Sequence, residues 1–237
     1  MIMSFYCNSN FTLYLSCNKM SSMKLYIISG LGADKTVFEH IVFPKKFSEV
    51  VFIDWLIPEG EETFEHFIKR MAEPINSKEK FCLLGYSFGG ILVQEIHKLK
   101  PAEQIVILGS IKSHKEMSVT FHLAKKSRIF AKLPESYFGE KTLKSYAFFR
   151  KLFDPNNPKF WRYFVVKDPH YLKWSINKIL DWKSEVNPDV IQILADKDIV
   201  FPPKNSKPNY VIKGGTHLFP VTKNKEVTKI LDEVFSK

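Results

Sequence analysis

The sequence predicts an α/β protein with a mostly parallel central sheet and helices on both faces. Short, continuous apolar segments recur along the 237 residues and alternate with segments in which apolar residues have helical spacing. Strands buried on both faces have this continuous pattern, and parallel strands need crossover helices between them. Such a sheet places its chemistry at the carboxyl ends of the strands. We therefore expect the functional residues directly after the apolar segments.

The first half of the chain contains four of the expected strands. They cover residues 24–30, 50–55, 81–85 and 104–109. Apolar residues at helical spacing predict helices between these strands. The helices are expected over residues 35–43, 61–72 and 89–99, with Asp34 capping the first of them and Pro44 ending it.

Residues 111–185 interrupt this alternation. They are helical in composition and rich in Lys and aromatic residues, so we expect a helical insert here. The strand pattern then resumes, and the chain ends on a helix. The expected elements are strands over 190–195 and 209–212 and a closing helix over 221–235.

Composition and charge limit the classes of function. Hydrophobic residues make up 45% and charged residues 25%, which is ordinary for one globular domain, expected over residues 23–237. The net charge of +10 has no long Lys/Arg block and no nucleic-acid-binding motif beside it, so we expect no nucleic-acid partner. No apolar run of 18 residues occurs, and we expect no membrane span.

The N-terminal segment and the cysteines give weaker indications. Residues 1–22 contain polar residues at intervals throughout and lack the basic start of a secretory signal, so they predict a disordered extension, with Met20 or Met23 as an alternative start. A hairpin pairing residues 5–7 with 11–15 is the other interpretation. Three cysteines do not build a disulfide framework, which favours a cytoplasmic location.

The segment Gly85-Tyr-Ser-Phe-Gly-Gly90 follows the third expected strand and opens a helix. A G-x-S-x-G sequence between strand and helix makes a very tight turn that projects the Ser87 hydroxyl above the sheet. The helix N-terminus beneath it favours developing negative charge. This pattern predicts Ser87 as a nucleophile.

The segment resembles the nucleophile elbow of the α/β-hydrolase family, and the resemblance extends from Met23 to the C-terminus. It implies an acid after the fifth strand and a base after the last one. Gly214-Gly-Thr-His217 fits the base position, which makes His217 the general base. Among the two acids after the fifth strand, Asp198 matches the family's spacing to Pro202, whereas Asp196 fits a turn-shaping role.

The resemblance also implies an oxyanion hole of two backbone N–H groups. One belongs to Phe88, after the nucleophile, and the other to Leu31, in the loop 29–34 (Ser-Gly-Leu-Gly-Ala-Asp). Ser29 stands where the family often has His. Because the donors are backbone groups, this departure leaves the expected function in place.

The implied reaction is hydrolysis of a carboxylic ester or related acyl bond through an acyl-enzyme on Ser87, without metal or cofactor. The same family pattern makes residues 111–185 a cap over the site. Its aromatic residues favour a small or medium-sized apolar acyl ester over a charged substrate. The alternatives are a thioesterase, a lactonase or an acyltransferase that uses the same residues, or a catalytically inactive ligand-binding protein of this fold.

Overall fold

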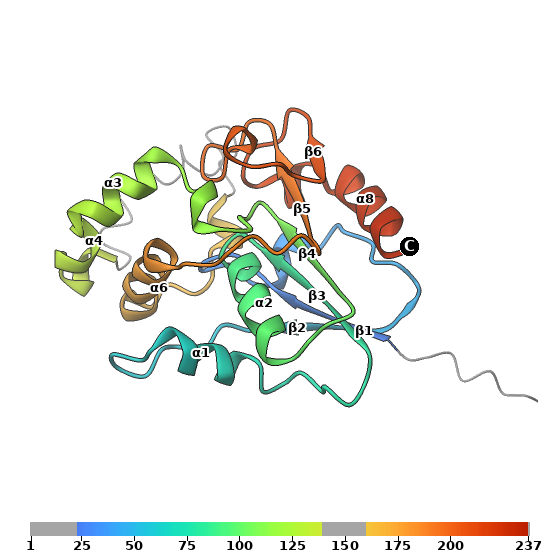
Figure 1. Ribbon diagram of the computed structural model, residues 1–237, viewed down its shortest axis with the longest axis horizontal. Helices are drawn as coiled ribbons and strands as arrows, with labels where there is room; N and C mark the ends of the chain where they lie inside the picture. Colours follow the sequence, from blue (N-terminus) through green and yellow to red (C-terminus); the bar gives the residue numbers. More distant parts are fainter. Residues whose placement is uncertain (1–22, 139–159, 237) are drawn as a thin grey trace, which may run out of the picture.

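The computed structural model describes residues 23–138 and 160–236, and this part of the chain builds a six-stranded sheet (Figure 1). Every neighbouring pair of strands in it is parallel. The predicted α/β class with a parallel sheet is confirmed. The strand order is β2-β1-β3-β4-β5-β6. The strands are β1 (Met23–Ile28), β2 (Phe47–Ile53), β3 (Phe81–Tyr86), β4 (Gln104–Leu108), β5 (Val190–Ala195) and β6 (Tyr210–Ile212).

Both faces of the sheet are covered, as the apolar pattern of its strands requires. The covering helices are α1 (Phe64–Met71), α2 (Phe88–Leu99), α7 (Phe219–Thr222) and α8 (Asn224–Ser236). In β1, Leu25 and Ile27 pack with the apolar face of α8, whereas Tyr26 and Ile28 pack with α1 and α2. Alternate residues of one strand thus enter two different cores, so a polar residue would be costly at any of these four buried positions.

The predicted helix over 35–43 is much shorter in the structure, where only Lys35–Phe38 form a 3₁₀ turn. Asp34 caps this turn by accepting a hydrogen bond from the Thr36 N–H at 2.9 Å, as expected. Beyond the turn, the Ile41 N–H bonds to the Phe38 carbonyl at 2.9 Å, and the Val42 N–H donates to the Thr228 hydroxyl of α8 at 3.2 Å. At Val42 a long-range bond thus stands where a continued helix would have a local one.

Two other helices differ from their predicted bounds. The helix expected over 61–72 begins at Phe64, because the Thr63 hydroxyl accepts from the His66 N–H and caps it there. The closing helix expected over 221–235 consists of α7 and α8, which are separated at Lys223.

Between β4 and β5 the described residues 111–138 and 160–185 form several helices, and we use the word cap only as a label for these two ranges. Its longer helices are α3 (Val119–Ser127), α4 (Ile129–Lys132) and α6 (Pro169–Asp181). Figure 1 shows them together at the end of the molecule opposite α8. The rest of the predicted insert, at 139–159, and the predicted extension at 1–22 lie outside the described residues. Across the described ranges, no helix has both the length and the apolar character needed to cross a membrane.

The imidazole of His170 ties α6 to two other segments. Its Nδ1 lies 2.8 Å from Glu135 Oε1 and its Nε2 lies 2.9 Å from the Gly60 carbonyl oxygen. Both partners are acceptors, so the ring satisfies both only when protonated. The hydrogen bond to Glu135, with the charge of that carboxylate and the Gly60 carbonyl, raises the pKa of His170 against the opposing effect of burial.

We predict that His170→Gln destabilises the protein at low pH only. A raised pKa adds stability below the ordinary histidine value of about 6.5, and this stability is lost as the pH rises through the folded-state pKa. Urea unfolding at about pH 5.5 should show a loss of up to about 1 kcal/mol that shrinks towards about pH 8.5. Glu135→Gln should reproduce this trend. A loss that does not change with pH would refute the ionic contact.

Candidate active site

The predicted nucleophile occupies the sharp turn between β3 and α2. Ser87 has φ 53° and ψ −119°, a backbone conformation that residues other than glycine rarely adopt. Its N–H donates to the Leu108 carbonyl at 2.8 Å, and its own carbonyl accepts from the Gly90 N–H at 2.9 Å. The backbone is therefore held in the strained state from both sides, and the side chain projects from the carboxyl edge of the sheet.

Glycines make this turn possible because the chain passes very close to its neighbours. A Cβ on Gly89 would lie 2.2 Å from the Ile28 carbonyl oxygen, and a Cβ on Gly85 would lie 2.4 Å from the Gly89 oxygen. Positions 85 and 89 must therefore both be glycine for helix α2 to start this close to the end of β1.

The structure brings the predicted base to the predicted nucleophile. His217 Nε2 lies 2.9 Å from Ser87 Oγ, although the two residues are 130 positions apart. The histidine follows β6, in the loop before α7, and none of its surface is exposed. The Tyr86 hydroxyl donates to the His217 carbonyl at 3.0 Å and fixes the backbone of this loop. Burial and the nearby Asp198 charge raise the pKa of Tyr86, so it stays a neutral donor.

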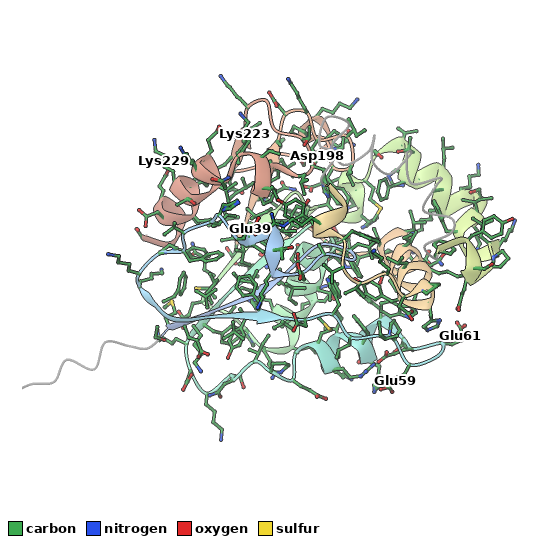
Figure 2. All side chains as sticks on the ribbon, turned by 180° about the vertical axis from the view of Figure 1, so that it is seen from behind. Glu39, Glu59, Glu61, Asp198, Lys223 and Lys229 are labelled. Carbon is green, nitrogen blue, oxygen red and sulfur yellow. The ribbon has the colours of Figure 1, made fainter. Side chains whose placement is uncertain are left out.

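The predicted acid lies on the other side of the imidazole. Asp198 Oδ2 is 2.8 Å from His217 Nδ1, and the residue is 2% exposed. Its second oxygen, Oδ1, accepts from the N–H groups of Val200 and Phe201 at 2.8 and 3.0 Å. Both carboxylate oxygens are thus hydrogen-bonded, and Figure 2 labels this residue within the outline of the molecule, whereas Lys229 of α8 is labelled at its edge. A carboxylate at Nδ1 places the imidazole proton there and leaves the Nε2 lone pair facing Ser87.

Asp196, the other acid after β5, points elsewhere. Its Oδ1 accepts from the Gly214 N–H at 2.7 Å, and the neighbouring Lys197 N–H donates to the Gly215 carbonyl at 3.0 Å. These bonds join the loop that carries Asp198 to the loop that carries His217. Asp196 therefore has the turn-shaping contacts that its sequence position suggests, and it makes them across two loops.

The two residues predicted to form an oxyanion hole lie on either side of Ser87. Phe88 is the first residue of α2, so its N–H has no carbonyl partner within the helix. Leu31 lies in the loop 29–34, where Gly32 has φ +70° and the Ala33 N–H closes a turn onto the Gly30 carbonyl at 3.0 Å. The left-handed conformation at Gly32 explains the glycine there.

A small cavity of about 20 Å³ adjoins the Ser87 hydroxyl, roughly the room for one or two water-sized groups. Its walls are mostly apolar and come from the loop 29–34, the cap and the loop after β6. Ser87 itself is 7% exposed. The lining side chains include Leu31, Val37, Tyr86, Tyr163, Phe164 and Leu218.

Three polar residues just after β4 bond to partners outside the series of Ser87, His217 and Asp198. His114 contacts the Ser184 carbonyl, and the Lys115 ammonium pairs with Glu185 at 3.0 Å. Lys112 donates to Asn209 at 3.2 Å, and burial lowers its pKa. Within residues 23–138 and 160–236, no group of three or more His, Cys, Asp or Glu side chains could hold a metal ion.

Two residues of the site region were missed by the sequence reasoning. Trp55 donates from its indole N–H to the Gly30 carbonyl at 2.9 Å, and the Tyr171 hydroxyl accepts from the Gly32 N–H at 3.2 Å. Both bonds act on the loop 29–34 from distant parts of the chain. No local sequence pattern marks such contacts, and the only sequence signal for them is the aromatic content of 14% in the whole chain.

The comparisons with known proteins agree with this architecture. No family model matches the sequence, and no curated protein matches it either. Among solved structures, a hydrolase from Pseudomonas aeruginosa aligns over 91% of this chain and 91% of its own, with a TM-score of 0.66 and 13% identity. The chain has the α/β-hydrolase fold.

Two further structures with this fold are enzymes of different kinds. A thermophilic esterase from Thermogutta terrifontis covers 91% of this chain and 90% of its own, with a TM-score of 0.61 and 14% identity. An epoxide hydrolase from Bacillus megaterium covers 91% and 94%, with a TM-score of 0.59 and 14% identity. At these identities the likeness is one of fold, and the chemistry must be argued from the residues of this chain.

We predict that Gly89→Ala disrupts this α/β-hydrolase elbow. The new Cβ would overlap the Ile28 and Ser29 carbonyl oxygens, at 2.2 and 2.3 Å, so β1 and α2 must separate. The free energy of unfolding in urea should fall by about 3 kcal/mol. Gly60→Ala is the control without steric overlap, because nothing lies within 4 Å of its Cβ position and only its positive φ of +55° disfavours alanine. It should lose only about 1 kcal/mol, and equal losses would contradict the packing argument.

Proposed function

We propose that this protein is a serine hydrolase that cleaves a carboxylic ester or a related acyl bond through an acyl-enzyme on Ser87. The observation that carries the proposal is a buried series of two hydrogen bonds through one imidazole. His217 Nε2 lies 2.9 Å from Ser87 Oγ, and His217 Nδ1 lies 2.8 Å from Asp198 Oδ2. A nucleophile, a base within reach of its proton and a group that orients the base are the requirements of covalent acyl transfer.

In the first half-reaction, Ser87 Oγ attacks the carbonyl carbon and passes its proton to His217 Nε2. The carbonyl π electrons move to oxygen, and the N–H groups of Leu31 and Phe88 stabilise the resulting oxyanion. Asp198 holds the imidazole in its tautomer and stabilises the imidazolium. The tetrahedral intermediate then collapses, and the leaving group departs with the proton from His217.

In the second half-reaction, a water molecule replaces the leaving group. It gives a proton to His217 as its oxygen attacks the acyl carbon, and collapse of the second intermediate returns the proton to Ser87 Oγ. The product is the free carboxylic acid. Each proton moves through His217, from Ser87 to the leaving group in the first half-reaction and from water back to Ser87 in the second, so the series of residues can carry the whole cycle.

The substrate that we propose is a small molecule with an apolar acyl group, without a nucleic-acid partner. The apolar walls of the cavity beside Ser87 support this choice, because they offer no charged partner for an ionic acyl group. Thioester and lactone substrates, or transfer of the acyl group to another acceptor, remain alternatives on the same residues. A cytoplasmic location is also proposed. It is supported by the free, buried thiol of Cys82, whose pKa burial raises to about 11.

A binding protein of the same fold without turnover is the alternative from another class. It has no need of a serine in a strained conformation, which costs about 1–3 kcal/mol, or of a completely buried histidine. The retention of both features supports catalysis over ligand binding alone.

We predict that Ser87→Ala abolishes turnover of p-nitrophenyl acetate and p-nitrophenyl butyrate. Removing the nucleophile of a triad lowers kcat by about 10⁶-fold, which is below detection in this assay. The variant should keep its fold, measured by circular dichroism and urea unfolding, because alanine retains the Cβ of serine. Equal activity in a folded Ser87→Ala variant would exclude the acyl-enzyme on this residue.

A pair of matched variants tests which aspartate orients the base. Asp198→Asn should lower kcat by about 10⁴-fold, because an amide can stabilise the wrong tautomer of His217. Asp196→Asn retains an oxygen that accepts from the Gly214 N–H, so its kcat should stay within about twofold of the wild type. The reverse ranking of the two variants would transfer the orienting role to Asp196.

A further inference from the structure

We propose that Trp55 is a positioning residue that aims one of the two oxyanion-binding N–H groups, that of Leu31. The inference rests on the proposed function and adds a residue that lies outside the triad. Trp55 follows β2 at the carboxyl edge of the sheet, and it is half-buried. Its indole N–H donates to the Gly30 carbonyl oxygen at 2.9 Å.

This hydrogen bond acts on the peptide group that would carry out the chemistry. The Gly30 carbonyl and the Leu31 N–H belong to one peptide unit, which is planar and trans. In a trans unit the C=O and N–H bonds point in opposite directions. A donor that fixes the direction of the Gly30 oxygen therefore fixes the direction of the Leu31 hydrogen as well.

The Gly30 oxygen has a second donor that belongs to the same loop. The Ala33 N–H reaches it at 3.0 Å, which closes the loop 29–34 on itself but does not attach it to the sheet. Trp55 supplies that attachment from the end of β2. Hydrogen bonds to a peptide oxygen also polarise the N–H of the same unit, which makes it a better donor to an oxyanion.

The ring of Trp55 also supports the residue that would provide the other donor. It stacks on the Phe88 ring with centroids 5.1 Å apart and an angle of 5° between the planes. On another side it meets Tyr171 of the cap at 5.5 Å. One indole thus contacts Phe88 directly and the Leu31 peptide through Gly30, so both sides of the expected oxyanion hole share one support.

A purely structural role would require only that the buried indole N–H find some acceptor. Trp174 on α6 provides that comparison within the same protein. It is 7% exposed, its N–H donates to the Glu62 carbonyl at 2.9 Å, and its ring packs against Phe64 and Phe67. The two tryptophans make bonds of equal length, but only the one at Trp55 ends on the peptide of an expected oxyanion donor.

The test compares Trp55→Phe with Trp174→Phe. Each variant keeps an aromatic ring and loses one indole hydrogen bond. For Trp55→Phe we expect kcat on p-nitrophenyl acetate to fall by about 10-fold, less than the full loss of an oxyanion donor, with KM within about twofold. Trp174→Phe should keep its kcat within about twofold while losing stability in urea.

A transition-state readout separates positioning from general damage. An aryl trifluoromethyl ketone forms a tetrahedral adduct with an active serine and places an oxyanion in the hole. Its inhibition constant should rise in Trp55→Phe by the same factor by which kcat/KM falls, and should not change in Trp174→Phe.

Each outcome decides one of the two proposals. If the wild type is active and both variants keep its kcat and its inhibition constant, the role of Trp55 is overturned and the proposed function stands. Equal losses in both variants would also overturn it, because the effect would then be one of stability. A folded wild type without turnover would overturn the proposed function and this inference together.

Discussion

The strained backbone at Ser87 is the constraint on which the rest of the structure depends. A residue with φ 53° and ψ −119° is unfavourable on its own, and such strain costs about 1–3 kcal/mol. It persists because β3 and β4 are hydrogen-bonded on one side and α2 starts immediately on the other. Glycines at 85 and 89 let these elements approach to distances that any side chain would prevent. The packing energy of the sheet and of α2 thus offsets the strain at Ser87 and fixes the position of its hydroxyl.

The parallel sheet explains how distant residues reach that hydroxyl. The loops after β3, β5 and β6 carry Ser87, Asp198 and His217, and all three loops leave the same edge. The bonds between Asp196 and Gly214 and between Lys197 and Gly215 then fix the last two loops to each other. The sheet supplies the approximate position, and these local bonds supply the distances of 2.8–2.9 Å that proton transfer requires.

The cap and the end of β2 act on the same region from above. Tyr171 and Trp55 bond to the loop 29–34 at Gly32 and Gly30, and the Val165 and Val166 N–H groups donate to the Gly32 carbonyl at 2.7 and 2.9 Å. This loop therefore has partners on three sides. A loop so constrained can present its N–H groups without reorganising, which is the main requirement of electrostatic stabilisation.

Much of this arrangement could be predicted from the sequence, because its signals are local. Strands buried on both faces give continuous apolar segments, and the elbow at Ser87 needs glycines at fixed spacing. The spacing from Asp198 to Pro202 identified the acid that the structure brings to His217. Helix ends were harder to predict, since the helix expected over 35–43 is only a 3₁₀ turn over Lys35–Phe38, and Val42 beyond it bonds to Thr228, far away in the chain. Trp55 and Tyr171 could not be placed for the same reason, because a contact between distant residues leaves no period in the sequence.

The most direct test of the central claim is to map the covalent adduct that a fluorophosphonate forms with the native protein. Intact-mass measurement followed by peptide analysis would locate it. We expect a single adduct on Ser87, because only this hydroxyl has a buried histidine nitrogen at 2.9 Å and the series to Asp198 behind it among the residues described here. An adduct on another residue, or none on a correctly folded protein, would contradict the account.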